Sequence, residues 1–237
     1  MKSGRFKCVD RNLTTIANLI PFMRLRPNPD GRDLMSRPDA PPDYFAGLGM
    51  GLKGLNLAWS ADPFEASERA GAQAAEVIAV VRDAARWLEA GGARLTTISD
   101  RLEGAGQAAL AILGADRTVA SRTEAPPEVV RSAKEGRKQA IDWFNALFER
   151  FDVLVTPTIQ YVAPTREEWA QAWADPGYML TYAAHTAASN LTGFPALSVP
   201  AGLVQGMPVG VQFWGPPDSE AMLFRIAEAF LNSRVAP

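Results

Sequence analysis

A short run of apolar residues, Val153 to Val155, directly follows a long amphipathic pattern, and this order limits the folds open to the chain. From Pro127, a residue suited to the first turn of a helix, apolar side chains recur at helical spacing as far as Phe148. An apolar run that is short, continuous and ended by Pro157 is typical of a strand buried on both faces. The sequence therefore predicts an α/β fold in which helices flank a central sheet of about five strands.

A strand, a helix and a second strand are predicted earlier in the chain. "GLKGLNLAWS" (Gly51 to Ser60) alternates apolar residues with the period of a strand, and a helical pattern follows it. We expect Ser67 to be the N-cap of this helix and Gly91–Gly92 to end it. "ARLTTIS" then reads as the second strand, and the strand-helix-strand order suits a parallel pair.

The stretch "NLTGFPALSVPAG", from Asn190 to Gly202, predicts a tight turn that leads into a buried strand. In "TGFP" the glycine permits backbone angles closed to other residues, and the proline favours an extended conformation for the residue before it. We expect the strand to occupy Ala196 to Val199 and to be ended by Pro200 and Gly202.

A second apolar strand is predicted from Val209 to Trp214, and it is followed by the last helix. Gly210 inside this strand suggests the close approach of another backbone or side chain. Asp218 is expected to cap the final helix, whose apolar residues from Leu223 to Leu231 form one core-facing stripe.

These elements suggest one domain over residues 1–237, without an internal repeat. Proline and glycine predict an irregular connector over residues 1–50. The strand-helix-strand region takes up 51–125, including a weakly specified helix from Leu102 to Ala120, and 126–237 holds the long helix, the core strands and the last helix. Two further helical patches are expected at Glu167 to Ala174 and Tyr178 to Ala188.

The composition excludes several classes of function. The 24 Lys and Arg nearly balance the 26 Asp and Glu, which gives a formal net charge of −2 and no field to attract nucleic acid or an anionic membrane. The single cysteine, Cys8, excludes an internal disulfide framework and a multi-cysteine zinc site, and no cluster of His, Cys and carboxylates suggests another metal or cofactor. Without a spanning apolar run or a signal-peptide pattern, the expected location is the cytoplasm.

Four blocks, "FDVLVTPT", "NLTGFPALSVPAG", "GMPVGVQFWG" and "EAMLFRIAEAF", resemble the C-terminal half of the amidase signature family in order and in spacing. "DLMSRPDAPPDYF" and "GLKGLNLAWS" resemble the segment that precedes the family's middle strand. The resemblance implies the C-terminal part of the mixed-sheet amidase signature fold, with helices flanking a central sheet. It also implies cleavage of the C–N bond of carboxamides by a serine nucleophile, a second serine and a lysine, without a cofactor.

The resemblance assigns no catalytic residue to this chain. In the family, the lysine and both serines lie before the matched region, and the serines lie in a Gly/Ser-rich loop. Here the only Gly-Gly pair, Gly91–Gly92, is followed by Ala93, and "GRFKCVDRN" resembles a degraded form of the segment after the catalytic loop. We therefore expect the chain to be inactive alone.

The resemblance does suggest residues for the wall of a substrate pocket. Thr192, Gly193 and Phe194 would shape the acyl or amine pocket. The stretch of the family that lies near the substrate corresponds to a second group of candidates, namely Trp169, Trp173, Tyr178 and Tyr182. For these aromatic residues a plain core or interface role is an equal alternative.

A replacement nucleophile is not evident in the sequence. His185, the only histidine, precedes Ser189 by four residues on a predicted helix, so their side chains share a face. Neither an orienting acid nor an oxyanion hole accompanies them, and a packing or local hydrogen-bonding role for His185 is favoured. The glycine-rich Gly47 to Gly54 lacks the strand-loop-helix order of a phosphate site, and Cys8 has no activating neighbour.

Two hypotheses follow. The chain is the C-terminal part of an amidase-type hydrolase, either a truncated chain or one half of a split enzyme, that acts on a small-molecule amide once an N-terminal half supplies the serines and the lysine. Alternatively, it is a non-catalytic pseudo-amidase or interaction module. In that case an uncovered sheet edge and apolar surface imply a partner or a homo-oligomer.

Overall fold

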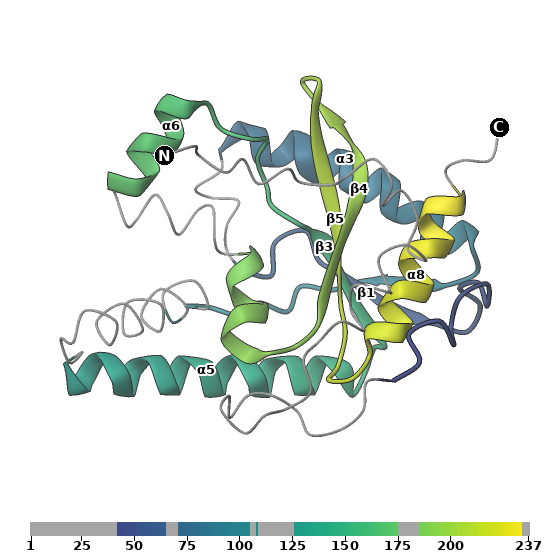
Figure 1. Ribbon diagram of the computed structural model, residues 1–237, viewed down its shortest axis with the longest axis horizontal. Helices are drawn as coiled ribbons and strands as arrows, with labels where there is room; N and C mark the ends of the chain where they lie inside the picture. Colours follow the sequence, from purple (N-terminus) through teal and green to yellow (C-terminus); the bar gives the residue numbers. More distant parts are fainter. Residues whose placement is uncertain (1–41, 65–70, 105–107, 109–125, 175–184, 234–237) are drawn as a thin grey trace, which may run out of the picture.

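The computed structural model describes residues 42–64, 71–104, 108, 126–174 and 185–233. Across these ranges, five strands form one mixed sheet in the order β2-β1-β3-β5-β4 (Figure 1). The strands are β1 (Asn56–Trp59), β2 (Arg94–Thr97), β3 (Val153–Pro157), β4 (Ala196–Val204) and β5 (Met207–Trp214). β2, β1 and β3 are parallel, whereas β5 is antiparallel to β3 and to β4.

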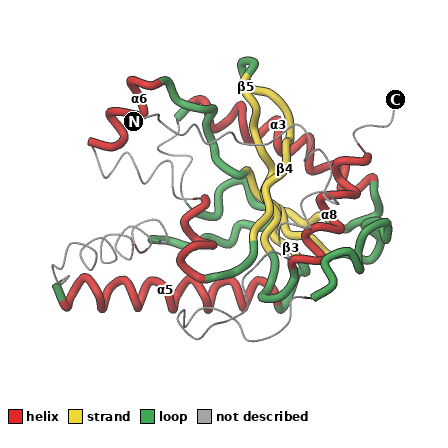
Figure 2. Tube along the Cα trace, viewed as in Figure 1, coloured by secondary structure: helices red, strands yellow, loops and turns green. Residues whose placement is uncertain are grey.

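Helices cover both faces of the sheet (Figure 2). The labelled helices are α3 (Ala72–Ala90), α5 (Pro127–Phe148), α6 (Arg166–Ala174) and α8 (Glu220–Ser233), and residues 185–192 are also helical. α3 and α8 share one buried apolar cluster with the sheet, and α5 and the 185–192 helix share the other. The predicted α/β fold with flanking helices is therefore confirmed. In the described ranges, no helix has both the length and the apolar character needed to cross a bilayer.

β3 is the central strand, as its apolar run predicts. Val153 and Val155 face the cluster beneath α3 and α8, and Leu154 faces α5. All five residues of β3 are buried, including Pro157, which lies within the strand rather than beyond it. A strand between two helical layers has no exposed face, and this explains why its sequence is continuously apolar.

The parallel pair of β1 and β2 is confirmed, with α3 between the two strands in sequence. The start of α3 differs from the prediction. Its N-cap is Gly71, and Ser67 lies outside the described residues. The helix ends as expected, since Gly91 is the C-cap and Gly92 has a φ of +96°, which glycine adopts without strain.

The prediction for β4 is wrong in two respects. The strand does not end at Pro200 and Gly202 but continues to Val204, with a register shift between these two residues. It is also not a buried strand, because it lies at the edge of the sheet and several of its side chains are exposed. An edge strand accommodates a proline and a bulge because one side of its backbone carries no ladder.

Gly136 lies in the middle of α5, and the structure explains why this long helix contains a glycine. A Cβ at Gly136 would come within 2.6 Å of the Cβ of Ala108. The chain segment at Ala108 therefore lies closer to α5 than any other residue at position 136 would allow.

The last helix, α8, begins at Glu220, directly after Ser219, and Asp218 has a φ of +66°. Its predicted stripe is buried from Leu223 to Phe230, with Leu231 half-buried beside it. Several predictions lie outside the described residues: most of the 1–50 connector including Cys8, nearly all of the Leu102 to Ala120 helix, and Tyr178 to Ala184.

Candidate functional site

The carboxyl ends of the parallel strands define the edge of the sheet at which α/β proteins most often bind ligands. Here, β1 runs into Ser60, Ala61 and Asp62, and β3 runs into Thr158 and the loop that holds Gln160. His185, on the helix of residues 185–192, lies at the same edge and is bonded to Pro157 at the end of β3. The described residues thus bring together polar groups from three separate parts of the chain.

His185 connects these three segments. Its Nδ1 lies 3.0 Å from the carbonyl oxygen of Pro157, and its Nε2 lies 3.2 Å from Oδ1 of Asp62. Both ring nitrogens face oxygen acceptors, so only a ring that carries a proton on each nitrogen donates to both at once. The ring of Phe64 packs edge-on against it at 5.4 Å. His185 is 2% exposed, which makes this a buried structural clamp.

A row of polar side chains crosses the sheet beneath this helix. Thr156 of β3 is opposite Gln212 of β5, which is in turn opposite Ser198 of β4. The Thr156 hydroxyl donates to the carbonyl of Pro157 and accepts from the Trp214 indole at 3.0 Å. Gln212 donates to the carbonyl of His185 at 3.3 Å. These bonds give the buried side chains of Thr156 and Gln212 hydrogen-bond partners. The bond from Gln212 also holds the 185–192 helix against the sheet.

Gln160, which is 1% exposed, belongs to the same edge. Its Nε2 donates to the carbonyl of Ala61 at 2.7 Å and so joins the loops after β1 and β3. Its Oε1 is buried without a hydrogen-bond partner among the described residues.

The hydroxyl of Ser198, at the end of this row, and the hydroxyl of Thr158, just after β3, meet across β5. The two oxygens are 2.6 Å apart, although their strands are separated by the whole width of β5. Gly210 lies between them, and a Cβ there would come within 2.7 Å of Thr158 Oγ1 and 2.9 Å of Ser198 Oγ. The close approach predicted at Gly210 is therefore confirmed, and the group that approaches is this pair of hydroxyls.

The predicted pocket residues of the "TGF" turn lie at the other end of the helix. Thr192 follows His185 by two helical turns, a rise of about 10 Å, and its hydroxyl donates to the carbonyl of Ala188 at 2.7 Å. Gly193 has a φ of +82°, which requires a glycine for an unstrained turn. Phe194 is buried and stacks on Phe144 with ring centroids 5.1 Å apart. Their role as pocket walls stays a prediction.

Of the predicted aromatic candidates, Trp169 lies on α6 and is 41% exposed. Trp173 is on the same helix, but its side chain is outside the described part of the structure. Tyr178 and Tyr182 also lie outside the described residues.

The other sequence candidates form no reactive group. The Ser189 hydroxyl donates to the carbonyl of Thr186 rather than to His185, so the two do not form a nucleophile-base pair. In the glycine-rich loop, the amide of Gly49 donates to the Glu228 carboxylate and Arg225 donates to the carbonyl of Gly51. The Glu228 carboxylate thus already accepts the backbone N–H of Gly49, which a bound phosphate would have to use.

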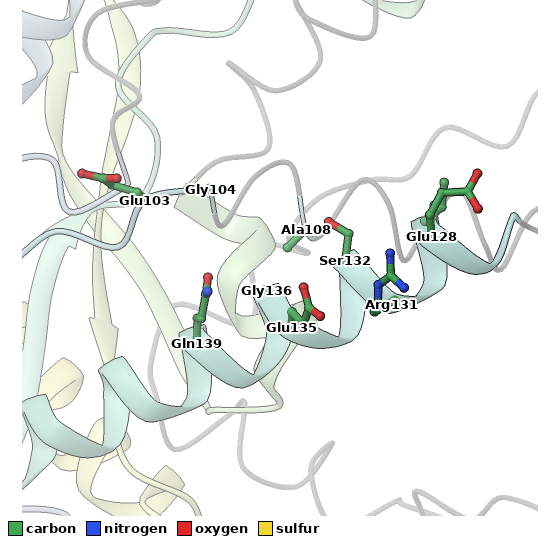
Figure 3. Close-up of a pocket in the computed structure, with 10 residues that line it drawn as sticks. Glu103, Gly104, Ala108, Glu128, Arg131, Ser132, Glu135, Gly136 and Gln139 are labelled. Carbon is green, nitrogen blue, oxygen red and sulfur yellow. The ribbon is translucent and has the colours of Figure 1, made fainter.

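A hollow of about 760 Å³ lies along α5, away from this edge (Figure 3). Glu128, Arg131, Glu135 and Gln139 of α5 line it, and Glu103 lies across from them. It is open and lined by several charged side chains, whereas pockets that bind small molecules are typically more enclosed. In the described ranges, no group of three or more His, Cys, Asp or Glu could hold a metal ion.

Sequence reasoning missed Asp62, Thr156, Thr158, Ser198 and Gln212. Two of them carried a signal, because Thr156 and Gln212 interrupt otherwise apolar runs in "VLVTP" and "VGVQFW". A polar residue in a buried strand needs a hydrogen-bond partner and so marks a polar neighbour. Neither signal identifies that neighbour, which comes from a distant part of the chain.

Comparisons with known proteins agree on one family. A family model described as Amidase matches residues 112–224. A glutamyl-tRNA(Gln) amidotransferase subunit from Synechococcus sp. (strain CC9902) is 31% identical over 92% of this chain and 52% of its own length. The crystal structure of the same subunit from Thermotoga maritima covers 91% of this chain and 50% of its own, at 24% identity and a TM-score of 0.71.

A bacterial aryl acylamidase of the amidase signature (AS) enzymes family has the same fold. It covers 92% of this chain and 51% of its own length, at 20% identity and a TM-score of 0.66. The chain thus spans about half the length of these relatives. Its mixed sheet with flanking helices corresponds to about half of their structures.

Proposed function

Because this chain belongs to the amidase signature family, we propose that it is the C-terminal half of an amidase-type hydrolase that cleaves the C–N bond of carboxamides. The observation that supports this most is the extent of the match. Relatives named as an acylamidase and as an amidotransferase subunit each cover over nine-tenths of this chain with about half of their own length.

In this proposal the chain binds and orients the substrate, and a second segment supplies the nucleophilic serine, its partner serine and the lysine. The contacts at the sheet edge are consistent with that division. His185 is held by Asp62 and Pro157, and Ser189 is bonded to its own helix, so His185 does not act as a general base for Ser189. The polar groups are placed for binding rather than for proton transfer.

The test begins with the DNA upstream of the Met1 codon, translated in all frames. A segment that encodes a Gly/Ser-rich loop and a lysine would be expressed together with this chain. The purified complex would be assayed with 4-nitroacetanilide, whose hydrolysis releases a coloured amine. We expect hydrolysis by the complex, none by this chain alone, and none when the nucleophilic serine of the added segment is replaced by alanine.

A folded complex that hydrolyses no amide would overturn the proposal. So would the absence of any complementing segment in the coding DNA. Either result would favour the non-catalytic interaction module, whose partner would then be sought with the intact chain as bait.

A further inference from the structure

We propose that Thr158 and Ser198 form a hydrogen-bonding subsite for an uncharged carboxamide at the carboxyl edge of the sheet. The inference rests on the proposed function, because it names the class of substrate that this half would hold. It starts from the 2.6 Å contact between the two hydroxyl oxygens above Gly210.

The pair differs from the other polar groups of this edge because it retains hydrogen-bonding capacity on the surface. Asp62 and His185 are bonded to each other, and Thr156 both donates and accepts within the core. Ser198, by contrast, is exposed, and Thr158 is half-buried. Within the described structure, the contact between them is the only hydrogen bond of either hydroxyl.

The chemistry of two bonded hydroxyls matches an amide. Each hydroxyl has one proton and two lone pairs, and the internal bond uses one proton and one lone pair. One proton is left to donate to a carbonyl oxygen, and lone pairs are left to accept from an amide N–H. A donor polarised by a second hydroxyl is also a stronger donor than an isolated one.

The charges nearby favour a neutral ligand. Among the described ionisable groups of this edge, Asp62 and His185 lie 3.2 Å apart and are bonded to each other. The two side chains of the subsite are themselves uncharged, so they offer neither a cation to hold a carboxylate nor a carboxylate to hold an ammonium group. A charged ligand would lose hydration here without a compensating ion pair.

Gly210 is the residue that makes the subsite possible. β3 and β4 are not neighbours, and two strand spacings of about 4.8 Å separate them. Their side chains meet only because position 210 has no Cβ, and a Cβ there would lie within 3 Å of both hydroxyl oxygens. Gly210→Ala is thus expected to separate the hydroxyls without removing either of them.

The experiment is a titration of the intact, isotope-labelled chain followed by nuclear magnetic resonance. The probes are propionamide, propionate and propylammonium, which are similar in size and differ in charge. We expect propionamide to shift the Thr158 methyl and the Gly210 amide resonances in a saturable manner, whereas the two charged probes leave these resonances unchanged.

The variants separate binding by the pair from general surface binding. Thr158→Val and Ser198→Ala each remove one hydroxyl and should weaken propionamide binding about fivefold. Gly210→Ala should weaken it at least as much. The matched control is Ser189→Ala, which removes a hydroxyl bonded to Thr186 on the 185–192 helix and should leave the affinity unchanged.

The inference is overturned if propionamide shifts neither resonance, if propionate binds equally well, or if the hydroxyl variants bind like the parent chain. A failure of the subsite can be told apart from a failure of the proposed hydrolase. A complex that hydrolyses amides with an unchanged KM in the Thr158→Val variant would keep the proposed function and remove the subsite. If propionamide binds at Thr158 and Ser198 but no added segment makes the chain hydrolyse amides, the subsite is kept and the proposed function is removed.

Discussion

His185 and Asp62 form a hydrogen-bonded pair across 123 residues of sequence, with Nε2 and Oδ1 3.2 Å apart. His185 lies on the 185–192 helix, which packs on one face of the sheet, and Asp62 follows the strand β1. The second ring nitrogen binds the end of β3 through Pro157. One side chain therefore fixes the relative positions of a helix and two strand ends at the candidate site.

Replacing His185 by alanine should lower the free energy of unfolding by about 3 kcal/mol, because it removes two hydrogen bonds of a buried ring, to Pro157 and to the Asp62 carboxylate, and leaves a cavity. Urea unfolding followed by tryptophan fluorescence measures the change. The control is Asn190→Ala on the same helix. Within the described ranges, the exposed Asn190 side chain bonds only to the carbonyl of Thr186, so this substitution should cost under about 0.5 kcal/mol. Equal stabilities of the two variants would contradict the role of the clamp.

Gly136→Ala should destabilise the chain even though alanine is the better helix former. The gain in helix propensity is about 1 kcal/mol, whereas forcing a Cβ to within 2.6 Å of the Ala108 Cβ costs about 1–3 kcal/mol. Thermal unfolding of Gly136→Ala, Ala108→Gly and the double variant checks this. The double variant should recover part of the loss, and a more stable Gly136→Ala protein would show that Ala108 does not pack there.

Phe144 is the centre of the apolar cluster between α5 and the sheet, with no exposed surface. Its ring stacks on those of Phe194 and Trp214 at 5.1 and 5.5 Å. Phe144→Ala should therefore cost about 3–5 kcal/mol in chemical unfolding. Trp87→Ala on α3 is the surface control, because Trp87 is 47% exposed, and its cost should be far smaller.

Asp100 and Arg150 predict a pH dependence of stability. The hydrogen bond from the Arg150 guanidinium, 2.8 Å away, lowers the pKa of the Asp100 carboxyl below its ordinary value. A carboxyl whose pKa is lower in the folded state stabilises the fold above its unfolded pKa of about 4. That contribution is lost as the pH falls through the lower, folded pKa.

Asp100→Asn should therefore cost a small amount of stability at pH 7, and the cost should disappear as the pH falls from about 4 to 2. The effect is small because both side chains are partly exposed, and added salt should reduce it further. Unfolding midpoints of the two proteins at several pH values test the sign. A difference that grows at low pH would contradict the assignment.

Local pattern was sufficient for much of the fold. The apolar run of β3 and the spacing of apolar residues in α5 predicted the type of each element and nearly its bounds. Both signals are local, because a buried strand and an amphipathic helix each show their pattern within a short stretch of sequence. Gly210 was also recognised as a place of close approach. The end of β4 was not predicted, since Pro200 stops a strand in the interior of a sheet but not at its edge, and position in a sheet is not a local property.

The α/β class, the main helices and the family follow from the sequence, because these depend on periodicity and on ordered blocks along the chain. Which polar groups meet depends on how the strands and helices are arranged in space. Asp62 reaches His185, and Thr158 reaches Ser198, across 123 and 40 residues. Such pairs form because strand order and register bring distant residues to one edge, and neither strand order nor register is encoded in any single segment.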